Sequence, residues 1–190
     1  MVLFNSDYTE GAHPKIMELM MSSNMEQTGG YGMDAYCDKA RALIRQQCGR
    51  EDIDVQFLVG GTQTNLTVIA ATLRPHQGVI SADTGHINVH ETGAVEATGH
   101  KVIALPSADG KLTAQQVLDC YHEHWNDATH EHIVQPGMVY ISNPTEIGSI
   151  YHRSELQALA AACRECGLPL FMGGARLGYG LAAEDNDLDL

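Results

Sequence analysis

Short apolar runs alternate with helical stretches along most of this chain, and this alternation limits the folds that it can adopt. Helical spacing, an opening proline or capping residues mark helices that begin near residues 14, 36, 66, 113 and 154. The apolar runs between them have the length of buried strands, at residues 55–59, 79–81, 102–105, 138–142 and 170–172. Strands that alternate with helices build βαβ units around a parallel sheet. The pattern therefore predicts an α/β fold in which helices flank a mostly parallel sheet.

Polar loops directly follow four of the predicted strands, at residues 60–63, 82–86, 143–146 and 173–176. Ligands of such sheets bind outside the carboxyl ends of the strands, where these loops meet. Packing alone does not explain four polar loops in such places. The sequence therefore predicts a binding site at this edge of the sheet.

The first of these loops has the residue types of a phosphate site. Gly60 and Gly61 let the backbone approach an anion closely, and the N–H groups of the following helical turn point at it. Thr62 and Thr64 can add side-chain hydrogen bonds. The loop has neither the P-loop pattern nor the dinucleotide-binding glycine pattern, and an ordinary tight strand-to-helix turn explains the same residues equally well.

Composition indicates an acidic globular protein. With 190 residues, of which 44% are hydrophobic, the chain can bury a core, and we expect one domain over residues 1–190. A net charge of −13 argues against a nucleic-acid partner. No apolar run approaches the roughly 20 residues of a membrane span, and the N-terminus lacks the basic region of a signal peptide. We therefore expect a cytoplasmic protein without a membrane partner, whose five cysteines are reduced.

Several motifs together resemble those of a known family; they lie at residues 3–9, 31–32, 60–65, 86–93, 142–145 and 174–176. In this order and spacing they are similar to the threonine aldolase and aromatic amino acid β-eliminating lyase family of fold-type I pyridoxal 5′-phosphate (PLP) enzymes. The resemblance covers nearly the whole chain. It implies a PLP-dependent lyase that cleaves β-hydroxy-α-amino acids to glycine and an aldehyde. It also implies a homo-oligomer, a dimer or tetramer, in which the Tyr31-Gly32 loop contributes to a neighbour's site.

The resemblance also assigns roles to individual residues. The cofactor phosphate would be held by the loop before the third helix, at Gly61, Thr62 and Gln63. His86 would stack on the pyridine ring, and Ser6 and Arg176 would reach the substrate carboxylate or the phenolic oxygen of the cofactor. The planar guanidinium of Arg176 suits a carboxylate, because it donates two parallel hydrogen bonds. His86 and Arg176 are thus the catalytic candidates, and no metal is expected.

Two features depart from the family pattern. Gly173 stands where the family has an aspartate that pairs with the protonated pyridine nitrogen, so we expect an aspartate placed there to strengthen cofactor binding. The lysine that forms the Schiff base lies further along in the family, and none of the lysines present, at 15, 39, 101 and 111, is placed to replace it. We therefore expect an incomplete PLP-binding large domain without the C-terminal small domain, inactive by itself.

Three other interpretations stay open. Histidine pairs at 122 and 124 and at 130 and 132 suggest a metal-binding module, although histidines two apart do not share a helix face. Cys163 and Cys166 lie three apart on a predicted helix and lack the second pair that a zinc site needs. A non-catalytic remnant that associates with other subunits is the second alternative. The third is another PLP-dependent reaction, β-elimination or transamination, because the same phosphate loop would serve each.

Overall fold

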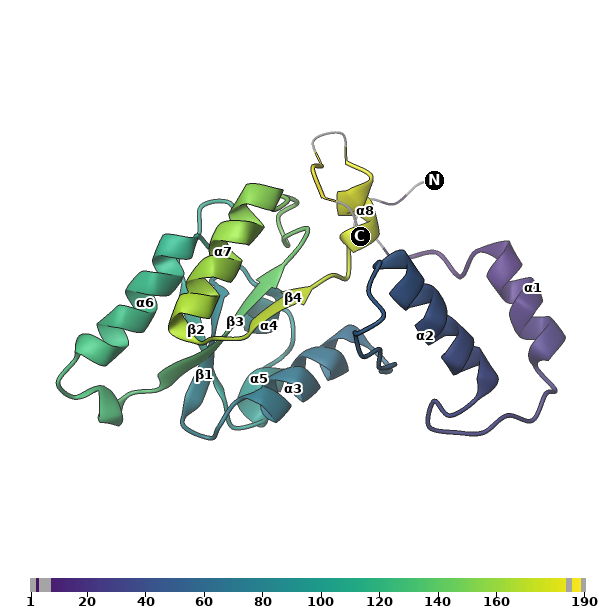
Figure 1. The fold of residues 1–190 in the computed structure, drawn as a ribbon, viewed down its shortest axis with the longest axis horizontal. Coiled ribbons are helices and arrows are strands. Elements are labelled where there is room, and N and C mark those ends of the chain that lie inside the picture. Colours follow the sequence, from purple (N-terminus) through teal and green to yellow (C-terminus); the bar gives the residue numbers. More distant parts are fainter. Residues whose placement is uncertain (1–2, 4–7, 184–185, 189–190) are drawn as a thin grey trace. The chain divides into compact units, whose positions relative to one another are not determined.

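The computed structural model describes residue 3, residues 8–183 and residues 186–188. The chain divides into two compact units, residues 1–57 and residues 58–190, and the single domain expected from the sequence stays a prediction. Two helices belong to the first unit, and a four-stranded sheet with its helices belongs to the second (Figure 1).

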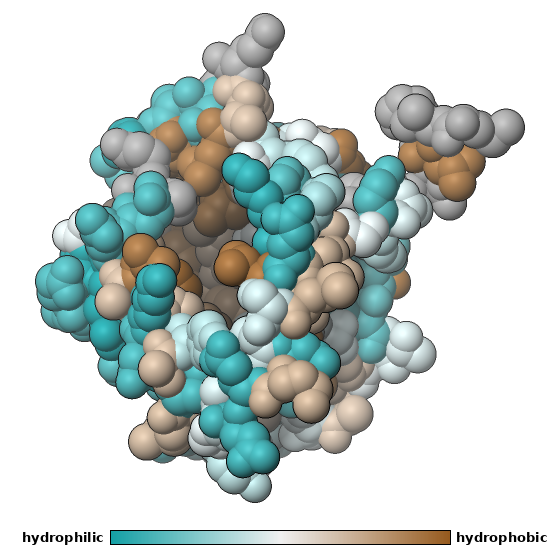
Figure 2. All heavy atoms as spheres, turned by 90° about the vertical axis from the view of Figure 1, so that its right-hand side faces the viewer, coloured by the Kyte–Doolittle hydropathy of each residue, from teal (hydrophilic) through white to brown (hydrophobic). Residues whose placement is uncertain are grey.

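Both helices of the N-terminal unit lie close to their predicted positions. α1 (Pro14–Ser23) opens with a proline, which suits the first turn because its missing N–H would have no helical partner there. α2 (Ala35–Gln47) follows Asp34, whose carboxylate accepts a hydrogen bond from the Cys37 N–H at 3.0 Å. α1 buries none of its residues, so apolar side chains such as Leu19 and Met21 lie at the surface, where apolar residues stand among polar ones (Figure 2).

The predicted strand at residues 55–59 is wrong. The segment is irregular, and its last residue, Val59, is 95% exposed. Arg41 of α2 holds the beginning of the segment through a hydrogen bond from Nε to the Val55 carbonyl at 3.2 Å. A strand needs a neighbouring strand to pair its backbone groups, and an apolar run that ends in glycines does not show whether such a neighbour exists.

Parallel strands form the sheet of the C-terminal unit, as predicted. They are β1 (Gln77–Ala82), β2 (Lys101–Leu105), β3 (Gln135–Ser142) and β4 (Leu170–Gly173), in the order β2-β1-β3-β4. Every pairing in the sheet is parallel. The central strands β1 and β3 are buried along almost their whole length, because helices cover both faces. Because the strands run parallel, the carboxyl ends of all four lie at one edge of the sheet.

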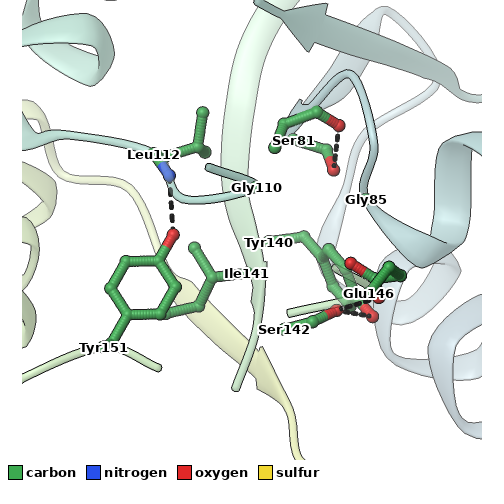
Figure 3. A pocket seen from close by; sticks show the side chains of 10 residues that line it. Ser81, Gly85, Gly110, Leu112, Tyr140, Ile141, Ser142, Glu146 and Tyr151 are labelled. Atoms are coloured by element: carbon green, nitrogen blue, oxygen red, sulfur yellow. Dashed lines mark hydrogen bonds between the residues drawn. The ribbon is translucent and has the colours of Figure 1, made fainter. Parts of the chain in front are cut away.

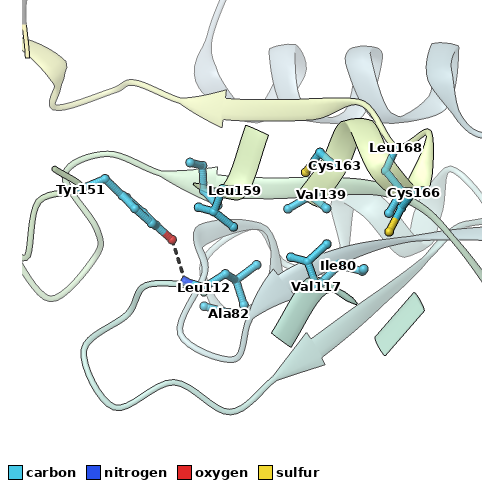
Figure 4. Packing of buried hydrophobic residues seen from close by; sticks show 11 residues of the cluster. Ile80, Ala82, Leu112, Val117, Val139, Tyr151, Leu159, Cys163, Cys166 and Leu168 are labelled. Carbon is cyan, nitrogen blue, oxygen red and sulfur yellow. Dashed lines mark hydrogen bonds between the residues drawn. The ribbon is translucent and has the colours of Figure 1, made fainter. Parts of the chain in front are cut away.

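The helices divide the core of this unit into two clusters. α6 (Ala114–Asn126) and α7 (Arg153–Cys166) cover one face, where Ile80, Val139 and Leu159 pack together (Figure 4). The other face carries α3 (Gly61–Thr72), α4 (His86–Val89) and α5 (Ala94–Ala97), with Val79 and Tyr140 in its cluster (Figure 1). Consecutive strand residues point to opposite faces, which is why Val139 and Tyr140 belong to different clusters. A 3₁₀ helix (His130–His132) and α8 (Leu177–Leu181) complete the unit.

Capping residues begin α6 and α7. Thr113 caps α6 as predicted, since its Oγ1 accepts from the Gln116 N–H at 3.2 Å and its own N–H donates to Gln116 Oε1 at 2.9 Å. The capping box predicted at Ser154 is wrong by two residues. α7 begins at Arg153, and the N–H of its N-cap, His152, donates to Glu155 Oε2 at 2.8 Å. A capping glutamate lies three residues after its N-cap, so Glu155 serves position 152.

All five cysteines are free, and Cys163 and Cys166 pack in the core on α7. Burial is the main cause that raises the pKa of the Cys163 thiol to about 11, so this thiol stays protonated at neutral pH. Within the described part of the chain, no helix is both long enough and apolar enough to cross a membrane.

Candidate active site

Predicted site residues lie at the carboxyl edge of the sheet. His86 begins α4 just after β1, and Arg176 stands between the end of β4 and α8. Because β1 and β4 both run parallel to β3, His86 and Arg176 share one edge, as the sequence predicts. Asn143 to Glu146 follow β3 at the same edge.

The first turn of α3 is open to an anion. Its N-cap, Gly60, is extended, and no side chain caps the N–H groups of the turn. A Cβ added at Gly60 or Gly61 would meet no described atom within 4 Å, so open space lies beside both residues. Gln63 turns its amide oxygen back to the Val59 N–H at 2.8 Å, which leaves its NH₂ group to meet a ligand. Together with the exposed Thr62, these donors have the character of a phosphate site.

A buried carboxylate, Glu91, joins this helix to His86. Glu91 Oε1 accepts a hydrogen bond from Asn65 Nδ2 at 2.5 Å and lies 2.7 Å from His86 Nδ1. The Glu91 side chain is completely buried, whereas that of His86 is one-third exposed. Glu91 therefore holds the imidazole of His86 in one orientation next to the beginning of α3.

The second oxygen of Glu91 has no such partner. Oε2 is buried and makes no hydrogen bond within the described part of the chain. Buried polar atoms are nearly always paired, so an atom of this kind marks a place where a ligand or an ordered water completes the structure.

The turn after Glu91 is strained. Thr92 has a φ of 54° and Gly93 a φ of 74°. A β-branched residue rarely takes this left-handed conformation, which costs roughly 1–2 kcal/mol. Backbone strain of this kind persists where the surroundings impose it and is concentrated at binding sites. Here it accompanies the carboxylate that orients His86.

The end of β4 lacks room for the family's aspartate. A Cβ placed on Gly173 would lie 2.5 Å from Tyr140 Oη and 3.1 Å from Tyr140 Cζ. Because the tyrosine hydroxyl fills this space, an aspartate at residue 173 does not fit beside it. The expected gain in cofactor binding from Gly173→Asp therefore does not follow from the structure.

Tyr140 belongs to a short chain of hydrogen bonds at the end of β3. Its Oη lies 3.1 Å from Ser142 Oγ, and Ser142 donates to Glu146 Oε1 at 2.7 Å (Figure 3). These side chains line a narrow pocket that has no room even for a water molecule, so this pocket alone is no cofactor site. Burial is the main cause that raises the pKa of Tyr140 to about 12, and the hydroxyl is therefore protonated at neutral pH.

The lysines of the C-terminal unit are held elsewhere. Lys101 is the first residue of β2 and therefore lies at the opposite edge of the sheet, as predicted. Lys111 pairs with Glu155 of α7 at 2.6 Å and lies over the ring of Tyr151, whose side chain packs on the α6–α7 face. Lys15 and Lys39 lie on α1 and α2 in the N-terminal unit.

For two further predicted residues, the structure gives no position relative to this cluster. Ser6 is outside the described residues. Tyr31 belongs to the N-terminal unit, where it has a φ of 62° and a fully exposed side chain, and Gly32 follows with a φ of 72°. An exposed tyrosine in this strained conformation is available to a second molecule.

The histidine-rich stretch has the character of a packed helix end. His124 is buried on α6, its Nδ1 makes no hydrogen bond among the described residues, and its ring packs edge-on against Trp125 and His130. Desolvation is the main cause that lowers the pKa of His124. No group of three or more His, Cys, Asp or Glu side chains in the described ranges is placed to hold a metal ion.

Three residues that complete the site were not assigned roles from the sequence: Asn65, Glu91 and Tyr140. Asn65 follows Thr62, Gln63 and Thr64 in the polar first part of α3, so the sequence does not show that its side chain is buried. Glu91 lies within the 86–93 motif, but nothing local shows that its side chain is buried. Tyr140 in an apolar strand has no local signal, because aromatic residues are common in strands.

These residues fit the phosphate and the ring of PLP. The open turn of α3 offers N–H donors, and Glu91 Oε1 orients the imidazole of His86. The other carboxylate oxygen, Glu91 Oε2, makes no hydrogen bond to the described residues. At the ring nitrogen the fit differs from the family pattern, because Tyr140 stands where the aspartate would be.

The family model for beta-eliminating lyases matches residues 4–183. The chain belongs to this family. Two curated relatives carry the description low specificity L-threonine aldolase. The one from Pseudomonas aeruginosa is 32% identical over 175 residues, which cover 91% of this chain and 49% of the relative. The one from a Pseudomonas species is 31% identical over the same shares of the two chains.

Solved structures agree with this membership. The threonine aldolase of Leishmania major is 49% identical with a TM-score of 0.92, over 97% of this chain and 53% of that protein. A PLP-bound C–S lyase from Staphylococcus hominis shares the fold alone, with 12% identity and a TM-score of 0.54 over 83% of this chain and 39% of that one. The fold is that of fold-type I PLP enzymes. This lyase-family chain spans about half the length of the curated relatives that it matches.

Proposed function

We propose that this chain forms the cofactor-binding part of a PLP-dependent lyase that cleaves β-hydroxy-α-amino acids to glycine and an aldehyde. The observation that carries the proposal is the hydrogen-bond network of Glu91, which joins the open turn of α3 to the imidazole of His86. Similarity to threonine aldolases over most of the chain supports the reaction class. Its five free cysteines and acidic composition support a cytoplasmic setting.

In this proposal the residues of the site each contact a particular part of the cofactor or of the substrate. PLP, when bound, supplies the electron sink for bond cleavage at Cα of the substrate. The backbone N–H groups of Gly61 and Thr62 hold the phosphate, and the partial positive charge of the α3 N-terminus adds to the attraction. His86, oriented by Glu91, lies against the cofactor ring. Arg176 binds the substrate carboxylate, and this grip selects which bond at Cα is broken.

In this proposal these residues bind the cofactor through non-covalent contacts and do not attach it covalently. Lys101 lies at the amino end of its strand, and Lys111 is paired with Glu155 on the other face of the sheet. We therefore propose that the chain binds PLP without a stoichiometric bond to any one of its lysines, and that it has no aldolase activity by itself.

The cofactor proposal is tested with pyridoxine 5′-phosphate, which has the phosphate and ring of PLP but no aldehyde for lysines to capture. Calorimetry should detect one site on the 190-residue chain, and His86→Ala should weaken binding about two- to tenfold, since ring stacking contributes roughly 0.5–1.5 kcal/mol. His122→Ala is the control, because His122 is an exposed histidine of α6, which covers the other face of the sheet. Absence of binding to the unmodified chain would refute the cofactor assignment.

Covalent attachment and reaction class need separate measurements. Borohydride reduction of the chain mixed with PLP, followed by mass mapping, should show no stoichiometric attachment at any one lysine. Glycine release from L-threonine together with such attachment would contradict the proposal for this chain. Release of a keto acid in place of glycine would reassign the reaction to β-elimination or transamination.

A further inference from the structure

The side-chain position of residue 173 is filled from the neighbouring strand. β3 and β4 pair in register, Tyr140 with Phe171 and Ser142 with Gly173. Side chains alternate along a strand, so residue 173 faces the same side of the sheet as Tyr140, the side that carries α3 and α4. The Tyr140 hydroxyl lies 2.5 Å from the place of a Gly173 Cβ, and Tyr140 can keep this position only opposite a glycine.

Tyr140 is held firmly in this place. It is 2% exposed, and its ring packs edge-on against Phe171 with centroids 5.4 Å apart. Tyr140 lines the same narrow pocket as Gly85, the residue that directly precedes His86 (Figure 3). The hydroxyl therefore borders the site that contains His86 and the beginning of α3.

The hydrogen bonds at the end of β3 make Tyr140 a donor. Ser142 gives its single hydroxyl hydrogen to Glu146, so its oxygen can only accept from Tyr140. The distance of 3.1 Å between Tyr140 Oη and Ser142 Oγ is long for a bond between two hydroxyl groups, whose usual range is about 2.5–3.0 Å. Tyr140 can exchange this weak bond for a better acceptor while Ser142 keeps its bond to Glu146.

We propose that the Tyr140 hydroxyl replaces a carboxylate at residue 173 and donates a hydrogen bond to the ring nitrogen of the bound cofactor. This inference rests on the proposed function. It explains why a glycine stands at the end of β4, since residue 173 and Tyr140 compete for one space. Tyr140 is thus a binding residue for the ring, in addition to the residues that hold the phosphate.

A phenol and a carboxylate act differently on a pyridine nitrogen. An aspartate stabilises the protonated ring through a charged hydrogen bond, whereas a phenol that retains its proton leaves the nitrogen unprotonated. The ring bound by this chain therefore carries no positive charge at its nitrogen and withdraws electrons less strongly.

The inference is tested with two probes that differ only at the ring nitrogen: pyridoxine 5′-phosphate and its 1-deaza analogue, in which a C–H replaces that nitrogen. The unmodified chain should bind the first probe about fivefold more tightly, because a neutral hydrogen bond contributes roughly 1 kcal/mol net. In Tyr140→Phe the ratio of the two affinities should fall to about one, since the ring packing remains and only the donor is lost.

Tyr151→Phe is the matched control. It removes the hydroxyl of another buried tyrosine, one that packs on the α6–α7 face and accepts from the Leu112 N–H at 2.6 Å, so the ratio should stay near that of the unmodified chain. A ratio that survives in Tyr140→Phe would overturn the assignment of Tyr140 while leaving the cofactor proposal intact. Failure of the unmodified chain to bind either probe would overturn both.

A second experiment, which needs no cofactor, tests whether the Tyr140 hydroxyl fills the space of a side chain at residue 173. Gly173→Ala should lower the melting temperature of the unmodified chain, because the added methyl group meets Tyr140 Oη. In the Tyr140→Phe background the same substitution should lower it less, since the nearest remaining contact is with the ring carbon Cζ at 3.1 Å. Equal losses in both backgrounds would show that the hydroxyl does not occupy this space, and would overturn the inference.

Discussion

At the scale of single residues, Glu91 is the side chain that links most of the site. Glu91→Ala removes the acceptor of both Asn65 and His86 and leaves a cavity, so we expect it to lower the free energy of unfolding by about 2–4 kcal/mol. It should also weaken binding of pyridoxine 5′-phosphate, because the imidazole is no longer oriented. Urea unfolding followed by the fluorescence of Trp125, the single tryptophan, measures the first effect.

Glu91→Gln separates hydrogen bonding from packing. The amide oxygen of glutamine can still accept from Asn65 and His86, so this variant should lose less stability than Glu91→Ala and keep part of the binding. If the two variants were equally unstable, the hydrogen bonds of Glu91 would not be what holds the site.

At the scale of elements, the first turn of α3 can be changed without disturbing the helix. Gly61 is exposed and has no described atom near the place of its Cβ, so Gly61→Ala should leave the fold as stable or improve it by up to about 1 kcal/mol. The new methyl group would occupy the space beside the proposed phosphate, and we expect at least a tenfold weaker affinity for pyridoxine 5′-phosphate, about 1.4 kcal/mol.

Calorimetry and a thermal melt on the same variant distinguish these effects. Thr67→Ala provides the control, because Thr67 is an exposed residue further along α3. Unchanged affinity in Gly61→Ala would place the phosphate away from this turn.

At the scale of the whole molecule, a buried thiol and two buried tyrosine hydroxyls should lower the free energy of unfolding at alkaline pH. Burial raises the pKa of Cys163 to about 11 and that of Tyr140 to about 12, and it raises the pKa of Tyr151 as well. In the unfolded chain these groups ionise near their ordinary pKa values, about 8.5 for Cys and about 10 for Tyr. Above about pH 9 the folded protein therefore holds more protons than the unfolded chain, and its stability falls as the pH rises.

Each of these groups contributes a slope of about 1.4 kcal/mol per pH unit between its two pKa values. The stabilisation is complete below the unfolded values and is lost as the pH passes the folded ones. Urea unfolding between about pH 9 and 11.5 should show a shallower decline for Tyr140→Phe than for the unmodified chain. Identical slopes would mean that Tyr140 ionises as an exposed tyrosine does.

Association is a second property of the whole molecule. α1 buries none of its residues, and Leu19, Met20 and Met21 are more than half exposed. Apolar surface of this kind favours contact with another chain, so light scattering should show dimers or larger species. Leu19→Lys with Met20→Glu should shift the protein towards the monomer without changing its unfolding midpoint. A stable monomer before substitution would contradict the expected homo-oligomer.

Local patterns in the sequence determined most of the architecture. The strands near residues 79–81, 102–105, 138–142 and 170–172 follow from apolar runs between helices, because this alternation is typical of a parallel sheet covered on both faces, in which the central strands β1 and β3 are buried most. The common edge of His86 and Arg176 follows in turn, since parallel strands bring their carboxyl ends together. The same reasoning failed at residues 55–59, where a similar apolar run is irregular in the structure.

Only the tertiary structure decided which side chains meet in the site. Asn65 and Glu91 are 26 residues apart, and they meet because α3 packs next to the turn that follows α4. Tyr140 reaches the place of a Gly173 side chain because β3 and β4 are neighbours in a particular register. Hydropathy and spacing describe each segment alone, whereas strand order, register and helix packing are set by how all segments bury their apolar faces together. This is why the sequence indicated an empty position at Gly173, and the fold showed a tyrosine filling it.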